Sequence, residues 1–255
     1  MAVVESELAG GVLTVTLADE ARRNALSRQL LSELIAVLDA ADADSEVRVV
    51  VLTNAGSTFC AGADLSDQAA GGGPPEPGSA TDPRVLFARF RHSPKPYVGR
   101  IAGHCVAGGM GLAAALDIAV AAEDVRFGFT EVRIGVAPAM ISVVCLPKLR
   151  PADARAAFLR GRRFDAAEAT RIGLINAAVP RDRLDAEVDL VVDDLLAGAP
   201  GALAATKELL VRVPTMSEDE AFSWTGELSA SLFAGDEARE GIAAYLEKRP
   251  ATWVP

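Results

Sequence analysis

The sequence contains few aromatic residues, cysteines or histidines. Aromatic residues make up only 5% of its 255 residues, so a buried core has to be built from Ala, Val, Leu and Ile. The three cysteines, Cys60, Cys105 and Cys145, stand far apart without paired spacing, which favours reduced thiols in a cytoplasmic protein. The histidines are His92 and His104, and neither CxxC nor HxxxH spacing occurs, so we expect no zinc or other metal site.

A basic excess and a long apolar run are also missing. The formal net charge is -10, which argues against a nucleic-acid partner because such proteins present a basic face. The longest apolar stretch, residues 101–120, is interrupted by four glycines, His104 and Asp117, and does not predict a membrane span. Residues 1–8 carry two glutamates and no apolar core, so we expect no signal peptide and no membrane partner.

Short runs rich in Val, Ile and Thr alternate with helical patterns in the first part of the chain. The predicted strands are residues 11–17, 47–53, 97–102 and 118–122. Ser27 opens a helix with leucines at helical spacing, and residues 108–116 form a second helix entered through a Gly-Gly pair. Strands that alternate with helices predict an α/β fold with a largely parallel sheet.

From Pro151 onward the pattern is helical. Asp165 caps a helix that ends at Gly173, and further helices are predicted at 184–196, 201–211, 217–233 and 236–248. We therefore divide the chain into an α/β core, residues 1–195, and a helical region, residues 196–255. No repeat of fixed period is visible. Residues 71–81, GGGPPEPGSAT, predict either an exposed connection or a flap beside a binding site.

Glycines at two positions suggest a site for a negatively charged oxygen. Gly108 and Gly109 precede an Ala/Leu-rich helix, whose first amides point outward without partners. Such amides bind an oxyanion or a phosphate, but a Gly-Gly pair also serves close helix–strand packing. The same two interpretations apply to residues 61–63. Neither GxGxxG nor a Walker A motif occurs, so nucleotide binding has no support.

Glu131 is the candidate general acid/base. It follows a short aromatic run and precedes Val132, Ile134 and Val136, and apolar surroundings would raise the pKa of its carboxylate. The alternatives are a surface glutamate in a turn and a glutamate paired with Arg133.

Six motifs in order resemble the crotonase (enoyl-CoA hydratase/isomerase) superfamily. They are RRNAL at 22–26, FCAGADL at 59–65, KPYVGRIAGHCVAGGMGL at 95–112, FGFTEVRIGVAP at 127–138, FDAAEATRIGLIN at 164–176 and FAGDEAREGIAAYLEKR at 233–249. The resemblance implies a ββα spiral core and a C-terminal helical trimerisation region, assembled as a homotrimer or homohexamer. It also implies an acyl-CoA substrate and no cofactor, since coenzyme A is part of the substrate.

The resemblance further implies roles for individual residues. The backbone amides of Ala63 and Gly108 would hold the thioester oxygen while Glu131 moves a proton. The positions that match the coenzyme A contacts are Arg22, Arg23, Ala25, Ala61, Asp64 and Leu65, with the arginines facing phosphate groups and the last three near the adenine. The acyl pocket is expected to involve Phe87, Phe90, Met140 and Ile141.

The chain departs from the family pattern at Gly111. Hydratases with two glutamates carry the first of them at this position, GGCEL in place of GGMGL, so one carboxylate is missing. The resemblance places Gly111 at the substrate, beside the reacting carbons; the alternative is that Gly111 only packs a helix. Single-glutamate relatives include enoyl-CoA isomerases, whereas AMISVVCLPKL after Pro138 resembles a bacterial enoyl-CoA hydratase-like branch. His104 is assigned to packing. The predicted activity is that of an enoyl-CoA hydratase, with an isomerase or a non-catalytic CoA-ester-binding subunit as alternatives.

Overall fold

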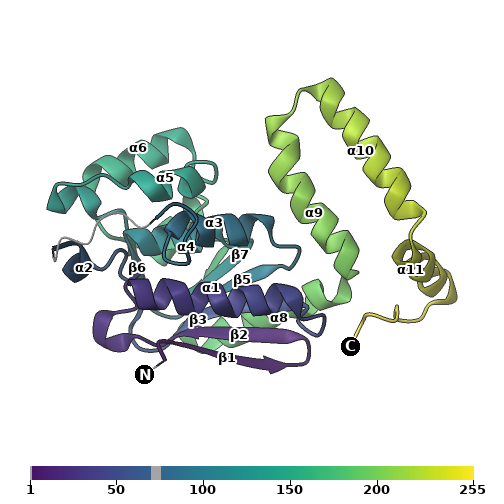
Figure 1. Cartoon of the computed structure of the whole chain (residues 1–255), viewed down its shortest axis with the longest axis horizontal. Coiled ribbons are helices and arrows are strands. Elements are labelled where there is room, and N and C mark those ends of the chain that lie inside the picture. The colour runs from purple at the N-terminus through teal and green to yellow at the C-terminus, as the bar shows by residue number, and fades with distance from the viewer. Residues whose placement is uncertain (1, 70–75) are drawn as a thin grey trace.

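Two β-sheets form the centre of the computed structural model, which describes residues 2–69 and 76–255 (Figure 1). In the described chain the larger sheet has six strands in the order β1-β2-β3-β5-β7-β10. They are β1 (Val4–Ala9), β2 (Val12–Leu17), β3 (Val49–Asn54), β5 (Tyr97–Ile101), β7 (Ile118–Ala122) and β10 (Ala177–Val179). β1 and β2 are antiparallel, and all other neighbours are parallel. β3 is buried along its whole length, as expected for a strand covered on both faces.

The smaller sheet shows how the chain winds. Within the described residues its four strands lie in the order β4 (Thr58–Cys60), β6 (His104–Val106), β8 (Arg126–Gly128) and β9 (Phe164–Asp165). β3, β5 and β7 are each followed by a strand of this sheet and then by helices, so successive ββα turns stack as a spiral. The predicted α/β class with a ββα spiral core is therefore confirmed. The turns differ in the lengths of their helices, which explains why the sequence shows no fixed period.

The helices of the core follow one another along the chain, and capping side chains mark the starts of some of them. They are α1 (Arg28–Ala43), α2 (Leu65–Ala69), α3 (Pro83–His92), α4 (Gly108–Ala115), α5 (Ala139–Cys145), α6 (Pro151–Arg160), α7 (Ala166–Arg171) and α8 (Leu184–Ala197). The Ser27 hydroxyl accepts a hydrogen bond from the Leu30 amide at 3.2 Å, which caps α1. Asp165 caps α7 in the same way. Both predicted helix starts are thus confirmed.

The prediction of an entirely helical chain after Pro151 is wrong. β9 pairs antiparallel with β8, and β10 pairs parallel with β7. Strands of two or three residues are too short to show an alternating pattern, so only the neighbouring strand specifies them. Of the predicted loop at 71–81, residues 71–75 lie outside the described residues. Residues 76–81 form turns that lead to Asp82, which caps α3.

Three helices at the C-terminus stand to one side of the core: α9 (Pro200–Arg212), α10 (Glu218–Phe233) and α11 (Asp236–Glu247) (Figure 1). The predicted boundary between residues 195 and 196 falls in the last turn of α8, which packs on β3, β5 and β7. That division stays a prediction. In the described part of the chain, no helix combines the length and the apolar character needed to cross a membrane.

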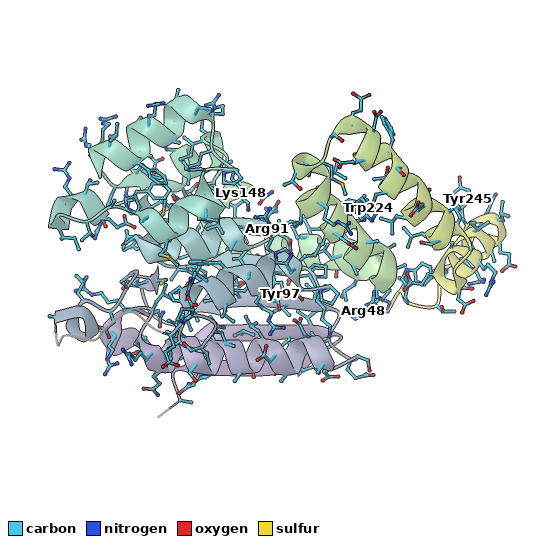
Figure 2. All side chains as sticks on the ribbon, turned by 45° about the horizontal axis from the view of Figure 1, so that its top comes forward. Arg48, Arg91, Tyr97, Lys148, Trp224 and Tyr245 are labelled. Atoms are coloured by element: carbon cyan, nitrogen blue, oxygen red, sulfur yellow. The ribbon has the colours of Figure 1, made fainter. Side chains whose placement is uncertain are left out.

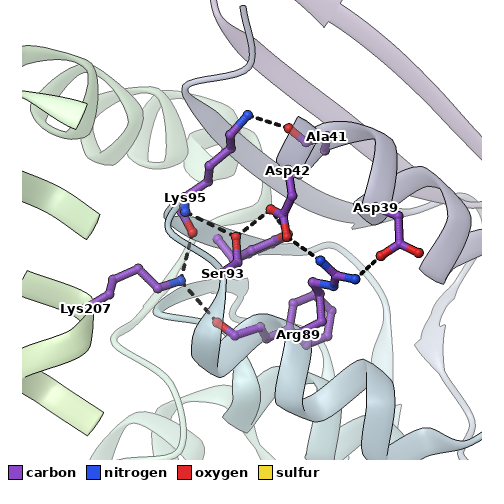
Figure 3. A network of polar contacts seen from close by, with 9 residues as sticks. Asp39, Ala41, Asp42, Arg89, Ser93, Lys95 and Lys207 are labelled. Atoms are coloured by element: carbon purple, nitrogen blue, oxygen red, sulfur yellow. Dashed lines mark hydrogen bonds and ion pairs between the residues drawn. The ribbon is translucent and has the colours of Figure 1, made fainter. Parts of the chain in front are cut away.

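Two cationic side chains connect the C-terminal region to the core. Lys207 on α9 donates from Nζ to the carbonyl oxygens of Phe90 at 3.1 Å and Lys95 at 2.8 Å (Figure 3). Arg48, labelled in Figure 2, donates to the carbonyl oxygens of Trp253 and Gly198, each at 2.9 Å. The α9 helix and the C-terminal tail are therefore held by hydrogen bonds to backbone carbonyls as well as by apolar packing.

Candidate active site

A cavity of about 450 Å³ lies where the β4–α2 connection, the start of α4, the segment after β8 and the start of α5 converge. Most of the residues predicted for the site line this cavity. They are Ala61, Ala63, Asp64, Leu65, Phe87, Gly108, Glu131, Met140 and Ile141. Residues separated by up to 80 positions in the sequence are thus brought to one place, because the spiral stacks the ends of its turns.

The backbones of Ala63 and Gly108 lie against each other. Gly62 has φ +93°, and a Cβ on it would stand 2.8 Å from the Gly108 nitrogen. A Cβ on Gly108 would in turn stand 3.4 Å from the Ala63 nitrogen. As the first residue of α4, Gly108 has an N–H with no acceptor within the helix. Two amide nitrogens therefore lie close together at the cavity wall, and the small residues leave room for an oxygen atom to approach them.

Ala107 is a part of the site that the sequence did not indicate. It precedes α4 with φ +49° and ψ -123°, a conformation that residues other than glycine rarely adopt. Its N–H donates to the Gly128 carbonyl oxygen at 2.9 Å, which holds the turn against β8. Strain of this kind persists where the surrounding structure imposes it, and it is frequent at functional sites. An alanine carries no sequence signal for a positive φ.

Glu131 opens the 3₁₀ helix η2 (Glu131–Ile134) at the cavity. Its Oε2 atom is buried and has no hydrogen-bond partner among the described residues. Burial raises the pKa of this carboxyl above its ordinary value. The predicted alternative, a pair with Arg133, is wrong: Arg133 donates instead to the Arg160 carbonyl oxygen at 2.8 Å and to that of Gly161. Glu131 thus has the surroundings of a group that exchanges protons.

A second carboxylate, that of Asp64, lines the cavity, but it already has a hydrogen-bond donor and a cation beside it. Asp64 accepts a hydrogen bond from the Ser66 amide at 2.9 Å, and its Oδ2 lies 3.8 Å from Arg22 Nη1. Asp64 therefore has a cation beside it, whereas Glu131 has a buried Oε2 without a hydrogen-bond partner and without an ion pair among the described residues.

The segment with Arg22, Arg23 and Ala25 lies beside the cavity rather than in its wall. The Leu26 N–H donates to the Gly62 carbonyl oxygen at 2.7 Å, and the Ala61 N–H donates to that of Arg23 at 3.1 Å. Both arginines are exposed, whereas Ala25 is buried. A ligand that leaves the cavity past Asp64 would meet Arg22 next.

Two predicted residues are placed behind the cavity. Phe90 is fully buried and packs edge-on against Tyr97, with ring centroids 5.1 Å apart. The prediction that Phe90 lines the pocket is therefore wrong. Gly111 is buried in α4 behind Phe87 and Ile141 and does not line the cavity. The apolar residues Ile134 and Val136 do line it, although the sequence suggested only that they surround Glu131.

His104 has a structural partner outside the cavity. Its Nδ1 accepts a hydrogen bond from the Arg126 amide at 3.0 Å, which joins β6 to β8 beyond their ladder. The described residues contain no group of three or more His, Cys, Asp or Glu side chains arranged to hold a metal ion.

Comparison with known proteins agrees with this geometry. The family model described as enoyl-CoA hydratase/isomerase matches residues 7–254. A Thermus thermophilus protein provisionally named enoyl-CoA hydratase is 37% identical over 249 residues, which covers 94% of this chain and 96% of its own. Enoyl-CoA hydratase EchA19 of Mycobacterium tuberculosis is 34% identical over 261 residues, which covers 98% of this chain and 97% of its own.

Solved structures agree as well. Pseudomonas aeruginosa AtuE superposes with a TM-score of 0.90 at 31% identity, covering 99% of this chain and 100% of its own. An enoyl-CoA hydratase of Mycobacterium smegmatis superposes with a TM-score of 0.88 at 28% identity, covering 98% of each chain. By the length matched, the identities and the shared fold, this chain belongs to the enoyl-CoA hydratase/isomerase family.

Proposed function

We propose that this protein is an enoyl-CoA hydratase-like lyase that adds water to, or removes it from, an enoyl-CoA thioester. The observation that carries the proposal is Glu131, a partly buried carboxylate with one oxygen lacking a partner, in the same cavity as the Ala63 and Gly108 amides. A carboxylate whose pKa is raised by burial is suited to take up and release a proton, and paired amides stabilise a developing oxyanion. No separate cofactor takes part in this chemistry.

In the proposed reaction the thioester oxygen accepts hydrogen bonds from the amides of Ala63 and Gly108. The oxygen of a water molecule forms a bond to C3 while Glu131 removes one of its protons, and the electrons of the C2–C3 double bond move into an enolate. Glu131 then returns the proton to C2, so that one water has been added. The coenzyme A part of the bound substrate extends out of the cavity along Ala61, Asp64 and Leu65. Its phosphates meet Arg22 and Arg23, near Ala25.

An enoyl-CoA isomerase is the second candidate. It is favoured by the ion pair of Asp64 with Arg22, which leaves Glu131 as the cavity carboxylate without an ion pair among the described residues. A single carboxylate is sufficient to remove a proton from C2 of a 3-enoyl thioester and return it to C4. A CoA-ester-binding subunit without activity is the alternative from another class.

A substrate panel separates the three. The purified protein is incubated with 2-enoyl- and 3-enoyl-CoA thioesters of several lengths, and the products are identified by liquid chromatography and mass spectrometry. We expect 3-hydroxyacyl-CoA from the 2-enoyl substrates. Conversion of only the 3-enoyl substrates would favour the isomerase, and calorimetric binding without any product would favour the binding subunit.

For assembly we propose a cytoplasmic homotrimer or homohexamer. Large apolar side chains on α10 and α11 are exposed, with Phe222 at 72%, Phe233 at 70% and Tyr245 at 84%. Figure 2 labels Tyr245 on α11. A groove of about 770 Å³ runs between α9, α10 and α11. Apolar surfaces of this extent favour burial between subunits.

A further inference from the structure

Gly111 lies where three helices converge. A Cβ on this residue of α4 would stand 2.5 Å from Cγ2 and 3.0 Å from Cβ of Ile141 on α5. It would also stand 2.9 Å from Cζ of Phe87 on α3. Even one methyl group at position 111 therefore needs a displacement of neighbouring side chains or of a whole helix.

These neighbours have little freedom to give way. Phe87 is 6% exposed and Ile141 4% exposed. Rotation of the Ile141 side chain moves Cγ2 but not Cβ, and its Cβ is already among the atoms that a new methyl would meet. One turn along α5, the Cys145 thiol donates to the Met110 carbonyl oxygen at 3.6 Å, so α5 is also held against α4.

The same two side chains form part of the cavity wall. Phe87 and Ile141 line the cavity, whereas Gly111 does not. α5 begins beside the catalytic candidate, because Glu131 and the α5 residues Met140 and Ile141 line the same cavity. In the proposed function the coenzyme A part leaves past Asp64. The acyl chain beyond the reacting carbons then continues along Phe87 and Ile141.

We propose that Gly111 determines acyl-chain specificity indirectly: by lacking a side chain, it lets Phe87 and Ile141 recede against α4 and keeps the cavity wide enough for an apolar acyl group larger than acetyl. The wall offers this group apolar side chains, from Phe87, Met140 and Ile141. A side chain at position 111 would push the wall into the cavity and exclude the larger acyl groups first.

The proposal rests on the proposed function only in placing an acyl-CoA in the cavity, so it is tested by binding rather than turnover. Acetyl-, butyryl-, hexanoyl- and 3-methylbutyryl-CoA are titrated calorimetrically into the wild type, Gly111→Ala, Ile141→Ala and the double variant. These saturated thioesters do not react, and the ratio of hexanoyl to acetyl affinity is the measured quantity. Val143→Ala is the matched control, because Val143 is on the same helix, 66% exposed and outside the cavity wall.

One methylene in an apolar pocket changes discrimination by roughly 10- to 200-fold. We expect Gly111→Ala to lower the hexanoyl-to-acetyl ratio by at least about 10-fold, and Ile141→Ala in the same chain to restore it. Ile141→Ala alone should raise the relative affinity for 3-methylbutyryl-CoA, and Val143→Ala should leave every ratio unchanged.

An unchanged ratio in Gly111→Ala, or an equal loss for all four thioesters, would overturn the proposal, as would failure of Ile141→Ala to restore the ratio. If Gly111→Ala does not fold, the single variant Ile141→Ala decides: an unchanged preference overturns the proposal. A wild type that binds the series but converts no enoyl-CoA refutes the proposed function and leaves the specificity result standing.

Discussion

The ammonium Nζ of Lys207 lies 2.6 Å from Oδ2 of Asp117, and this pair joins α9 to the core between β5 and β7. The same carboxylate oxygen accepts a hydrogen bond from the Tyr97 amide at 2.7 Å, and Lys207 lies 5.0 Å from the centre of the Tyr97 ring. Figure 3 shows Lys207 reaching from α9 to the carbonyls around Lys95. The only cation at this junction that is buried is therefore shared between a carboxylate and two backbone carbonyls, within the described residues.

Removing this cation should destabilise the protein. Lys207→Ala removes the ammonium that lies 2.6 Å from the partly buried Asp117 carboxylate, and loss of one partner of a buried pair costs about 3–5 kcal/mol. Urea denaturation at a fixed protein concentration measures the change in the free energy of unfolding. Arg91→Ala, which removes an exposed cation from α3, is the control and should be nearly neutral. Equal stability of the two variants would contradict a stabilising role for Lys207.

Glu131→Gln should lower kcat by at least about 10²-fold, the low end for loss of a general acid/base, with affinity for the CoA ester nearly unchanged. The glutamine amide keeps the shape of the side chain but cannot take up and release the proton as the carboxylate does. Steady-state kinetics and calorimetry measure the two quantities. Glu123→Gln, a change at an exposed carboxylate, should keep wild-type turnover. Wild-type turnover by the Glu131 variant would refute the mechanism.

The difference in stability between Glu131→Gln and the wild type should depend on pH. The pKa of Glu131 is raised in the folded protein by burial, so its ionised form opposes folding, and its stability contribution is lost as the pH rises through the folded pKa. The variant should therefore have a higher thermal midpoint than the wild type at pH 7. The difference should shrink as the pH falls from the raised folded pKa toward the ordinary glutamate value of about 4.3, and stay constant below it. A difference that is constant from pH 4 to pH 8 would mean that Glu131 carries no penalty for ionisation.

Gly62→Ala should disable the pair of amides. An added Cβ would stand 2.7 Å from Cβ of Ala107 and 2.8 Å from the Gly108 nitrogen, and φ +93° is unfavourable for alanine. Loss of one oxyanion donor costs about 10²- to 10³-fold in kcat. Gly226→Ala is the control, since a Cβ there meets no atom within 4 Å. A Gly62 variant that folds and turns over normally would show that the amide geometry is not needed.

Sedimentation velocity should show a trimer or a hexamer at micromolar concentration. The expected cause is burial of the apolar side chains on α10 and α11, among them Phe233 and Tyr245. Phe233→Asp should shift the distribution toward smaller species by placing a charge in the buried surface. A wild-type monomer under these conditions would contradict the proposed assembly.

The sequence by itself determined the types of the longer elements and the chemistry available. Alternation of β-branched runs with helical leucine spacing indicates strands and helices because burial follows those two periods. Ser27 and Asp165 mark helix starts because a side-chain oxygen satisfies amides of the first turn, which is a local requirement. Motif order pointed to Ala63, Gly108 and Glu131, and the fold places all three at one cavity.

The tertiary structure decided what lies next to what. Arg133 stands two residues after Glu131 in the sequence, but it donates to carbonyl oxygens at the end of α6. Glu131 therefore keeps an oxygen without a partner among the described residues. Gly111 and Phe90 belong to segments that line the cavity, yet neither residue lines it. Phe87 and Ile141 cover Gly111, and Phe90 packs against Tyr97, because the packing of neighbouring helices decides which residues reach the cavity. The positive φ of Ala107 and the short strands β9 and β10 have no local cause at all. Local propensities cannot encode them, since the energy that stabilises them comes from neighbours distant in sequence.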